Sequence, residues 1–248
     1  MLPDIEVDDV TARQWGQDGT NDPRHEIIRA VEDCLRSGWA RVHLSGVGQR
    51  EEALADAFRG VGVLRASRRS TTSVIDALIP VSQESALPRS LSVRFGTGEL
   101  PFHTDGAHLR VPPRLLVLYC AMDEERRPTR LLHWDAVERG LSDPQQLRRE
   151  VFRYRSGRDS FLDTIAASHR EYVRLDPGCM VPATRRADTL LGEIRERMTV
   201  LESEDEMWEA GAALVIDNWR VLHGRGQAER AGARVLFRLQ LDLYPSAQ

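Results

Sequence analysis

The sequence predicts a mainly β fold, a double-sheet jelly roll with flanking helices. Short apolar or alternating segments of strand length recur between residues 91 and 243. Turn-forming residues separate several of them, as at Gly96-Thr97-Gly98 and Asp217-Asn218. Only a few stretches carry helical periodicity. Short strands combined with few helices are typical of a jelly roll with helical additions.

Length and composition favour one domain. A chain of 248 residues can bury a single large core, and no boundary or internal repeat divides it. We expect one domain over residues 1–248. Residues 1–60 would form a part made of helices and a strand, and residues 90–245 would form the jelly-roll core.

Charge and hydropathy exclude two classes of partner. The net charge of −4 argues against a protein that binds nucleic acid mainly by charge. The longest apolar run, residues 115–122, is too short to span a bilayer, and residues 1–6 lack the apolar region of a secretion signal. We therefore expect a cytoplasmic protein with no nucleic-acid or membrane partner, which can form a homo-oligomer. Three widely spaced cysteines indicate neither a disulfide framework nor a zinc ribbon.

The N-terminal part predicts a helix, a strand and a second helix. Residues 23–36 carry apolar side chains at helical spacing after an Asp-Pro start. Residues 40–44 alternate as a strand does, and residues 49–59 again favour a helix. Residues 65–89 are rich in arginine and serine, have weak periodicity and predict loops or a lid.

The middle of the chain predicts strands around a turn. In residues 91–95, leucine, valine and phenylalanine alternate with serine and arginine, the pattern of a half-buried strand. Gly96-Thr97-Gly98 then turns the chain into a strand that carries a His-x-Asp pair. Residues 115–120 are almost continuously apolar, which predicts a strand buried on both faces, with Cys120 as a small buried side chain.

The rest of the chain alternates between helical and strand-like stretches. Helices are predicted at residues 135–150, as one or two short ones, and at 187–202. Strands are predicted at residues 152–154, 160–165, 213–216, 221–223 and 235–243.

The His-x-Asp pair, His103 and Asp105, is a candidate metal site. Positions i and i+2 of a strand point to the same face, so one strand can provide two ligands. His223, far downstream, would complete a set of two histidines and one carboxylate, which leaves coordination positions open as in non-haem Fe(II) oxygenases. The pair alone is weak evidence for a metal site, because most histidines have structural roles. Asp217 and Asn218 could either hold the turn or hydrogen-bond a ligand.

Two arginines share one face of the last predicted strand. Arg234 and Arg238 alternate with Val235, Phe237 and Leu239. If this face points inward, the arginines need anionic partners, because a buried unpaired charge is costly. A dicarboxylate co-substrate would provide one, bound by the guanidinium fork. The alternative is a solvated face.

Taken together, these segments resemble the TauD/TfdA-like (taurine dioxygenase-like) Fe(II)/2-oxoglutarate-dependent dioxygenases. The resemblance runs in order over residues 24–245 and is dense near 91–140 and 210–240. It is carried by residues 98–105 (GELPFHTD), 112–115 (PPRL) and 217–225 (DNWRVLHGR), with Thr129 and Arg234.

The resemblance implies a fold, a metal and a co-substrate. The fold would be a double-stranded β-helix, a jelly-roll or cupin-like relative. His103, Asp105 and His223 match the catalytic iron ligands. Arg234 matches the arginine that binds the distal carboxylate of 2-oxoglutarate, assisted by Thr129. Arg238 falls where some relatives place an arginine near the substrate's anionic group or the co-substrate, and O2 would be the oxidant.

The chain departs from the family pattern in two places. Relatives often have Gly-Gly-x before the co-substrate threonine, but residues 126–128 are Arg-Arg-Pro, so the loop before Thr129 differs. Ala212 replaces a common aspartate, which should change only a turn. Iron halogenases of this broad class lack the carboxylate ligand, so Asp105 argues against halogenation.

The implied activity is hydroxylation, desaturation or cyclisation of a small molecule, such as an amino acid, a small acid or a natural-product intermediate, with release of succinate and CO2. The alternatives are a catalytically silent metal- or partner-binding protein on the same scaffold, and a metal-dependent hydrolase or isomerase. Arginines in residues 153–158 are candidate substrate contacts or part of a solvated hairpin. His108 and Arg110 are further candidates, whereas His133 and Trp134 should pack or cap the following helix.

Overall fold

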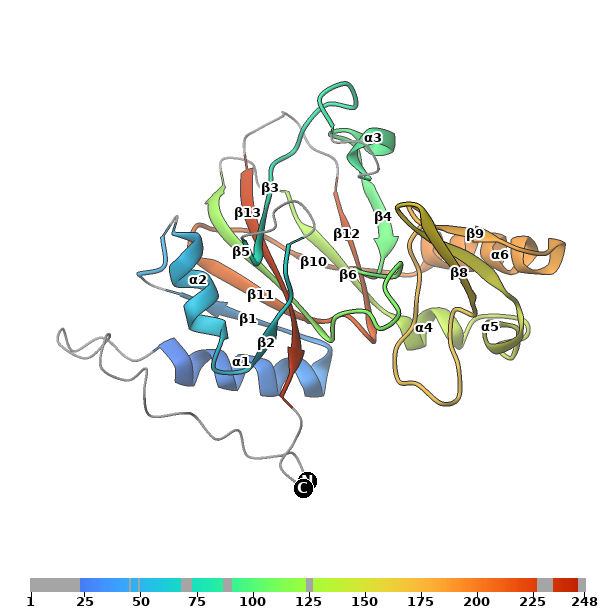
Figure 1. Ribbon diagram of the computed structural model, residues 1–248, viewed down its shortest axis with the longest axis horizontal. Coiled ribbons are helices and arrows are strands. Elements are labelled where there is room, and N and C mark those ends of the chain that lie inside the picture. The colour runs from blue at the N-terminus through green and yellow to red at the C-terminus, as the bar shows by residue number, and fades with distance from the viewer. Residues whose placement is uncertain are drawn as a thin grey trace.

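The computed structural model describes residues 23–44, 46–48, 50–67, 73–86, 91–123, 127–226 and 234–244. Within these ranges the chain is rich in strands that pair in antiparallel fashion, and helices flank the sheets (Figure 1). The larger sheet contains β1 (Trp39–His43), β2 (Gly62–Leu64), β3 (Ile75–Leu78), β5 (Leu115–Asp123), β11 (Ala212–Asp217) and β13 (Arg234–Leu243).

Two smaller sheets complete the strand content. The first contains β4 (Leu100–His103), β6 (Thr129–His133), β10 (Glu204–Glu206) and β12 (Val221–Arg225). The second contains β7 (Phe152–Ser156), β8 (Asp159–Asp163) and β9 (Met180–Pro182). The helices are α1 (Pro23–Ser37), α2 (Glu51–Phe58), α3 (Ser92–Phe95), α4 (Trp134–Glu138), α5 (Gln146–Arg149) and α6 (Arg185–Val200).

Three clusters of buried apolar residues show how the layers pack. One cluster joins α1 and α2 to one face of the six-stranded sheet. A second joins the other face of that sheet to β6 and β12 of the four-stranded sheet. A third joins the far face of the four-stranded sheet to β7, β9 and α4–α6. The two larger sheets therefore enclose a core between them, and Figure 1 shows this order of layers.

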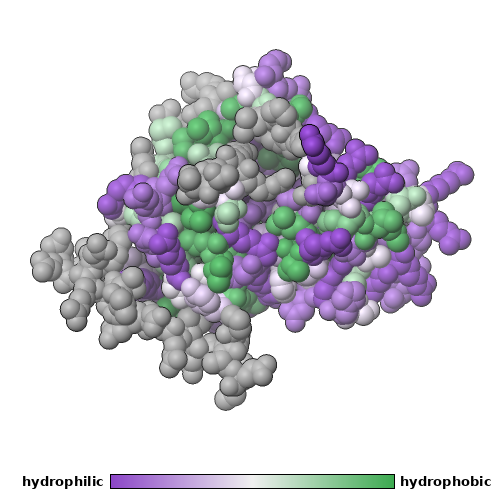
Figure 2. Space-filling model, in the orientation of Figure 1, coloured by the Kyte–Doolittle hydropathy of each residue, from purple (hydrophilic) through white to green (hydrophobic). Residues whose placement is uncertain are grey.

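The apolar patterns explain why the central strands form where they do. The continuous run in β5 is buried on both faces because helices cover one side of its sheet and strands cover the other. Cys120 is fully buried, as predicted. The alternation along β13 places Phe237 and Leu239 in the helix-facing core. Figure 2 shows hydrophilic side chains over the α6 end of the molecule and apolar ones nearer the middle of that face.

The prediction of a strand at residues 91–95 is wrong. This stretch contains α3, where the amide of Phe95 donates to the carbonyl of Leu91 at 3.0 Å, and the helix ends at Gly96 with φ of 50°. None of its residues is buried, and Val93 is exposed. Alternation alone does not make a strand when no neighbouring strand pairs with it.

Other element boundaries also differ from the sequence prediction. β4 ends at His103, so Asp105 lies in the turn after the strand and not on it. β8 ends at Asp163, two residues before the predicted end. Residues 65–89, predicted as loops or a lid, contain β3, while residues 68–72 and 87–89 lie outside the described residues, as do residues 1–22. Among the described residues, no helix is both long and apolar enough to span a membrane.

Candidate metal centre and its pocket

Strand pairing brings the two histidines of the sequence motif together. β4 and β12 are antiparallel neighbours, and His103 and His223 are directly opposite each other in the register. Their ring centroids are 4.4 Å apart. Nδ1 of His103 lies 3.0 Å from the carbonyl oxygen of Pro101. A donated hydrogen there leaves Nε2 as the ligand atom, the usual arrangement for a metal-binding histidine.

Asn218 sets the position of Asp105. The side-chain oxygen of Asn218 accepts from the amide of Asp105 at 2.7 Å, and its amide group donates to the carbonyls of Asp105 and Pro113, both at 2.9 Å. Asp217 instead accepts from the amide of Trp219 at 3.1 Å and from Arg220 at 2.6 Å, so it stabilises the turn. Of the two roles considered for this pair, Asn218 supports a candidate ligand and Asp217 holds the turn.

The ligand atoms of His103, Asp105 and His223 converge in a buried cluster. They lie within 4.8 Å of one another, and Oδ1 of Asp105 is 3.6 Å from Nε2 of His103 and 3.8 Å from Nε2 of His223. Ligand atoms around one first-row metal ion are roughly 3 Å apart. Modest side-chain rotation would therefore bring all three onto one ion, and two imidazoles with one carboxylate suit Fe(II).

The electrostatics of the cluster favour the ligating forms of Asp105 and His223. Burial would raise the pKa of Asp105, but the charge of Arg238 and the nearby histidines hold that pKa well below its usual range. Burial and the charge of His103 lower the pKa of His223. Burial would lower the pKa of His103, but Asp105 raises it.

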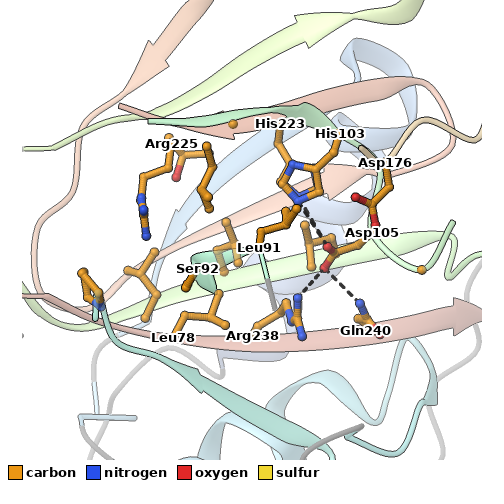
Figure 3. Close-up of a pocket in the computed structure, with 18 of the residues that line it drawn as sticks. Leu78, Leu91, Ser92, His103, Asp105, Asp176, His223, Arg225, Arg238 and Gln240 are labelled. Atoms are coloured by element: carbon orange, nitrogen blue, oxygen red, sulfur yellow. Dashed lines mark hydrogen bonds and ion pairs between the residues drawn. The ribbon is translucent and has the colours of Figure 1, made fainter. Parts of the chain in front are cut away.

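The second oxygen of Asp105 is held from the opposite sheet. Oδ2 accepts from Nη1 of Arg238 at 3.0 Å and from Nε2 of Gln240 at 2.9 Å (Figure 3). Nη2 of Arg238 donates to Oδ2 of Asp76 at 2.6 Å. Oδ1 is thereby left to face the two histidines.

A cavity of about 520 Å³ between the two larger sheets opens onto this cluster. The six residues that match the family's metal and co-substrate positions all line it: His103, Asp105, Thr129, His223, Arg234 and Arg238. The hydroxyl of Thr129 accepts from the indole N–H of Trp208 at 3.1 Å. Arg234 is buried at the start of β13, where its Nη1 donates to the carbonyl of Arg127 at 2.9 Å.

Most of the other residues that the sequence offered as candidate substrate contacts lie away from this cavity. The arginines of residues 153–158 are exposed on the β7–β8 hairpin and do not line it. Arg110 stacks on Phe161 instead, whereas His108 is part of the wall. The ring of His133 packs against that of Trp39 in a tilted arrangement with centroids 4.8 Å apart, in agreement with a packing role. Trp134 is buried at the first position of α4.

Arg225, Gln240 and Asp176 are among the charged or polar residues of the cavity that sequence reasoning missed. Arg225 is two residues beyond His223 on β12, and Gln240 continues the alternation of Arg234 and Arg238 on β13, so strand periodicity could have found both. Asp176 lies in a loop, and nothing in the surrounding sequence marks it. Burial lowers the pKa of Arg225 to about 10, with a further contribution from the charge of Arg127.

The chain is similar in architecture to several solved structures that are distant in sequence. An asparagine oxygenase, crystallised with Fe(II), 3-hydroxyasparagine and succinate, matches with a TM-score of 0.68 and 16% identity, over 89% of this chain and 78% of that one. A taurine dioxygenase from Burkholderia xenovorans matches with a TM-score of 0.64 and 18% identity, over 91% and 83%. The non-haem iron oxygenase OrfP, crystallised with iron and α-ketoglutaric acid, matches with 0.62 and 17%, over 88% and 79%.

The chain has the fold of the TauD-like oxygenases. This structural match confirms the predicted double-stranded β-helix and the resemblance on which that prediction was based. No protein-family model matches the sequence, and no curated protein does. The TauD-like fold is thus recognised through the arrangement of its strands.

Proposed function

We propose that the chain is an Fe(II)/2-oxoglutarate-dependent oxygenase that hydroxylates, desaturates or cyclises a small molecule. The observation that carries this proposal is the buried cluster of His103, Asp105 and His223 on a cavity that Thr129 and Arg234 also line. The fold agrees, since the similar structures include an asparagine oxygenase and OrfP with iron bound.

The chain's residues fit the metal and the co-substrate. His103, Asp105 and His223 would hold Fe(II), and the guanidinium of Arg234 would bind the distal carboxylate of 2-oxoglutarate in a bidentate fashion. The Thr129 hydroxyl accepts from Trp208, which leaves its hydrogen for that carboxylate. When bound, iron and 2-oxoglutarate supply the activation of O2, with succinate and CO2 as co-products.

The protein's own contribution is placement and exclusion of water. Asn218 fixes the backbone of Asp105, and Arg238 and Gln240 fix one oxygen of its carboxylate. Ligands held in this way keep their geometry while a substrate binds. The buried apolar side chains of Leu116, Leu118 and Leu236 line the cavity, which limits water around the reacting groups.

The names of the similar structures favour an amino acid as the substrate. The asparagine oxygenase was crystallised with a hydroxylated asparagine, and OrfP with a hydroxylated arginine and succinate. We therefore place hydroxylation of an amino acid or a related small acid ahead of desaturation and cyclisation. A catalytically silent binding protein would not need the arrangement of Arg234 and Thr129 beside the cluster.

An anaerobic spectroscopic titration tests the proposal. Fe(II) with 2-oxoglutarate should give a weak visible charge-transfer band, which His103→Ala abolishes and Arg234→Ala weakens by raising the dissociation constant for 2-oxoglutarate. Arg155→Ala, on the exposed hairpin, is the matched arginine control and should leave the band unchanged. Absence of a band from the wild-type protein at saturating metal and co-substrate would refute the proposal.

A further inference from the structure

The cavity holds four charged residues in addition to the three candidate metal ligands and His108: Asp176, Arg225, Arg234 and Arg238. Arg234 is assigned to 2-oxoglutarate under the proposed function, on which this inference rests. A charge that is already neutralised within the protein contributes little to substrate recognition. The ion-pair partners of Asp176, Arg225 and Arg238 therefore decide which of these residues is available to a substrate.

Arg238 is already neutralised. Its two Nη atoms donate to Oδ2 of Asp76 at 2.6 Å and to Oδ2 of Asp105 at 3.0 Å. The side chain of Asp76 is only 6% exposed, so an anion that drew Arg238 away would leave a buried carboxylate unpaired. Arg238 therefore serves as a positioning residue for Asp105, and not as the site of a substrate anion.

Arg225 differs from Arg238 in having no anionic partner. Its Nη2 donates to the backbone carbonyls of Gly96 and Gly98 at 2.6 and 2.8 Å, and among the described residues no carboxylate pairs with it. Its Nε is buried without a hydrogen-bond partner in the same part of the chain. A partly buried cation that only neutral carbonyls contact favours binding of an anion from outside.

Asp176 is the negatively charged counterpart of Arg225 in the cavity. Its Oδ1 accepts from the amide of Gly178 at 2.7 Å, and among the described residues no arginine or histidine forms an ion pair with it. Arg94 of α3 donates to the carbonyl of Pro177 at 2.7 Å, which fixes the adjoining loop against the cavity. In Figure 3, Asp176 and Arg225 lie on opposite sides of His103 and His223.

We propose that Arg225 and Asp176 recognise a zwitterionic substrate that lies across the candidate metal centre. Arg225 would bind its carboxylate, and Asp176 would bind its ammonium group. When Arg234 binds 2-oxoglutarate and Arg238 is paired with Asp76 and Asp105, two charges of the cavity remain for a substrate. They are the positive charge of Arg225 and the negative charge of Asp176. A small molecule with a carboxylate at one end and an ammonium group at the other, such as an ω-amino acid, neutralises both, whereas an α-carboxylate and an α-ammonium on one carbon are too close together to lie on opposite sides of the centre.

The test measures binding to the protein loaded with Co(II) and 2-oxoglutarate, which does not require turnover. The probes are ω-amino acids of increasing chain length, their carboxamides, which lack the carboxylate, and their N-acetyl derivatives, which lack the ammonium. Perturbation of the Co(II) absorption gives dissociation constants. For an amino acid that binds the wild-type protein, we expect each derivative to bind ten- to hundredfold more weakly, the range for loss of a charged hydrogen bond.

The variants assign each end of the ligand. Arg225→Gln should abolish the preference for the free acid over the amide, while Arg225→Lys, which keeps the charge and guards against a folding defect, should preserve part of it. Asp176→Asn should abolish the preference for the free amine over the N-acetyl form. Arg155→Gln and Asp159→Asn, both exposed on the β7–β8 hairpin, are the matched controls and should change neither preference.

Three outcomes overturn the inference. If Arg225→Gln weakens binding of 2-oxoglutarate and leaves amino-acid binding unchanged, Arg225 belongs to the co-substrate site. If the wild-type protein binds Co(II) and 2-oxoglutarate but no zwitterion, the substrate inference is wrong and the proposed function stands. If it binds neither Co(II) nor 2-oxoglutarate, the proposed function itself is wrong.

Discussion

A single amide side chain joins three parts of the site. Asn218 contacts the backbone of Asp105 through both its amide hydrogen and its carbonyl oxygen, and it also contacts the carbonyl of Pro113. The asparagine is fully buried, so these hydrogen bonds have no competition from water. An amide fits here because the site needs an acceptor and two donors from one short side chain.

Asn218→Ala should destabilise the fold by about 1–3 kcal/mol, because it leaves buried backbone groups without partners. It should also weaken Co(II) binding, because Asp105 loses its backbone restraint. Asn218→Asp is the matched variant: it keeps the acceptor for the amide of Asp105 but loses both donors. Urea unfolding and Co(II) titration measure the two effects, and an alanine variant with wild-type metal affinity would show that Asn218 does not position the ligand.

At the scale of elements, the β7–β8 hairpin is joined to the loop that follows Asp105. Asp163 at the end of β8 forms ion pairs with Arg170 at 2.6 Å and Arg174 at 3.1 Å. Arg174 is almost fully buried and donates to the carbonyls of Ala107, Leu109 and Arg110. The hairpin thus supports the metal centre indirectly, although its exposed arginines do not reach the cavity.

The ion pairs of Asp163 predict a pH dependence of stability. Burial would raise the pKa of Asp163, but the hydrogen bond and charge of Arg170 lower it overall. A depressed folded-state pKa adds stability above the unfolded value of about 3.9, and this is lost as pH falls below that value.

Asp163→Asn should therefore cost about 1–2 kcal/mol near pH 7. The difference from the wild-type protein should shrink as the pH falls below about 4, where the carboxylate of the unfolded chain becomes protonated, and should be lost at the lower pH at which the native carboxylate is protonated too. Urea unfolding at a series of pH values measures this difference. Asp159→Asn, exposed on the same strand, should have no such effect. A constant difference across the whole range would contradict the assigned charge interaction.

At the scale of the whole molecule, the site bridges the two larger sheets. The histidines come from β4 and β12 of the four-stranded sheet, whereas Arg238 and Gln240, which hold Asp105, come from β13 of the six-stranded sheet. A bound metal would therefore link groups on both walls of the core between the sheets, and its binding should add to the stability of the entire fold.

Co(II) at a hundred times its dissociation constant should stabilise the protein by about 2.7 kcal/mol. For a chain of this size, that corresponds to a rise in Tm of roughly 5–10 °C. Differential scanning calorimetry with and without Co(II) measures the shift, and His103→Ala should show none. An equal shift in that variant would locate the stabilising metal elsewhere.

The sequence by itself determined the features that depend on neighbouring residues along the chain. Helical spacing predicted α1 and α6, the continuous apolar run predicted the buried β5, and strand alternation placed Arg234 and Arg238 on one face. The residue types at 103, 105 and 223 predicted a metal cluster, because only a few side chains provide such ligands.

Only the tertiary structure decided which charges are paired and where the isolated segments lie. Asp76 and Arg238 are 162 residues apart in sequence and 2.6 Å apart in space, so no local pattern reveals that this arginine is neutralised. No local pattern reveals that Asn218, 113 residues away in sequence, positions Asp105. Nor does a local pattern reveal that the alternating sequence of residues 91–95 forms the helix α3, because no neighbouring strand pairs with it. Periodicity records contacts between residues close in sequence, whereas ion pairs, strand pairing and cavity walls depend on segments that meet only in the folded chain.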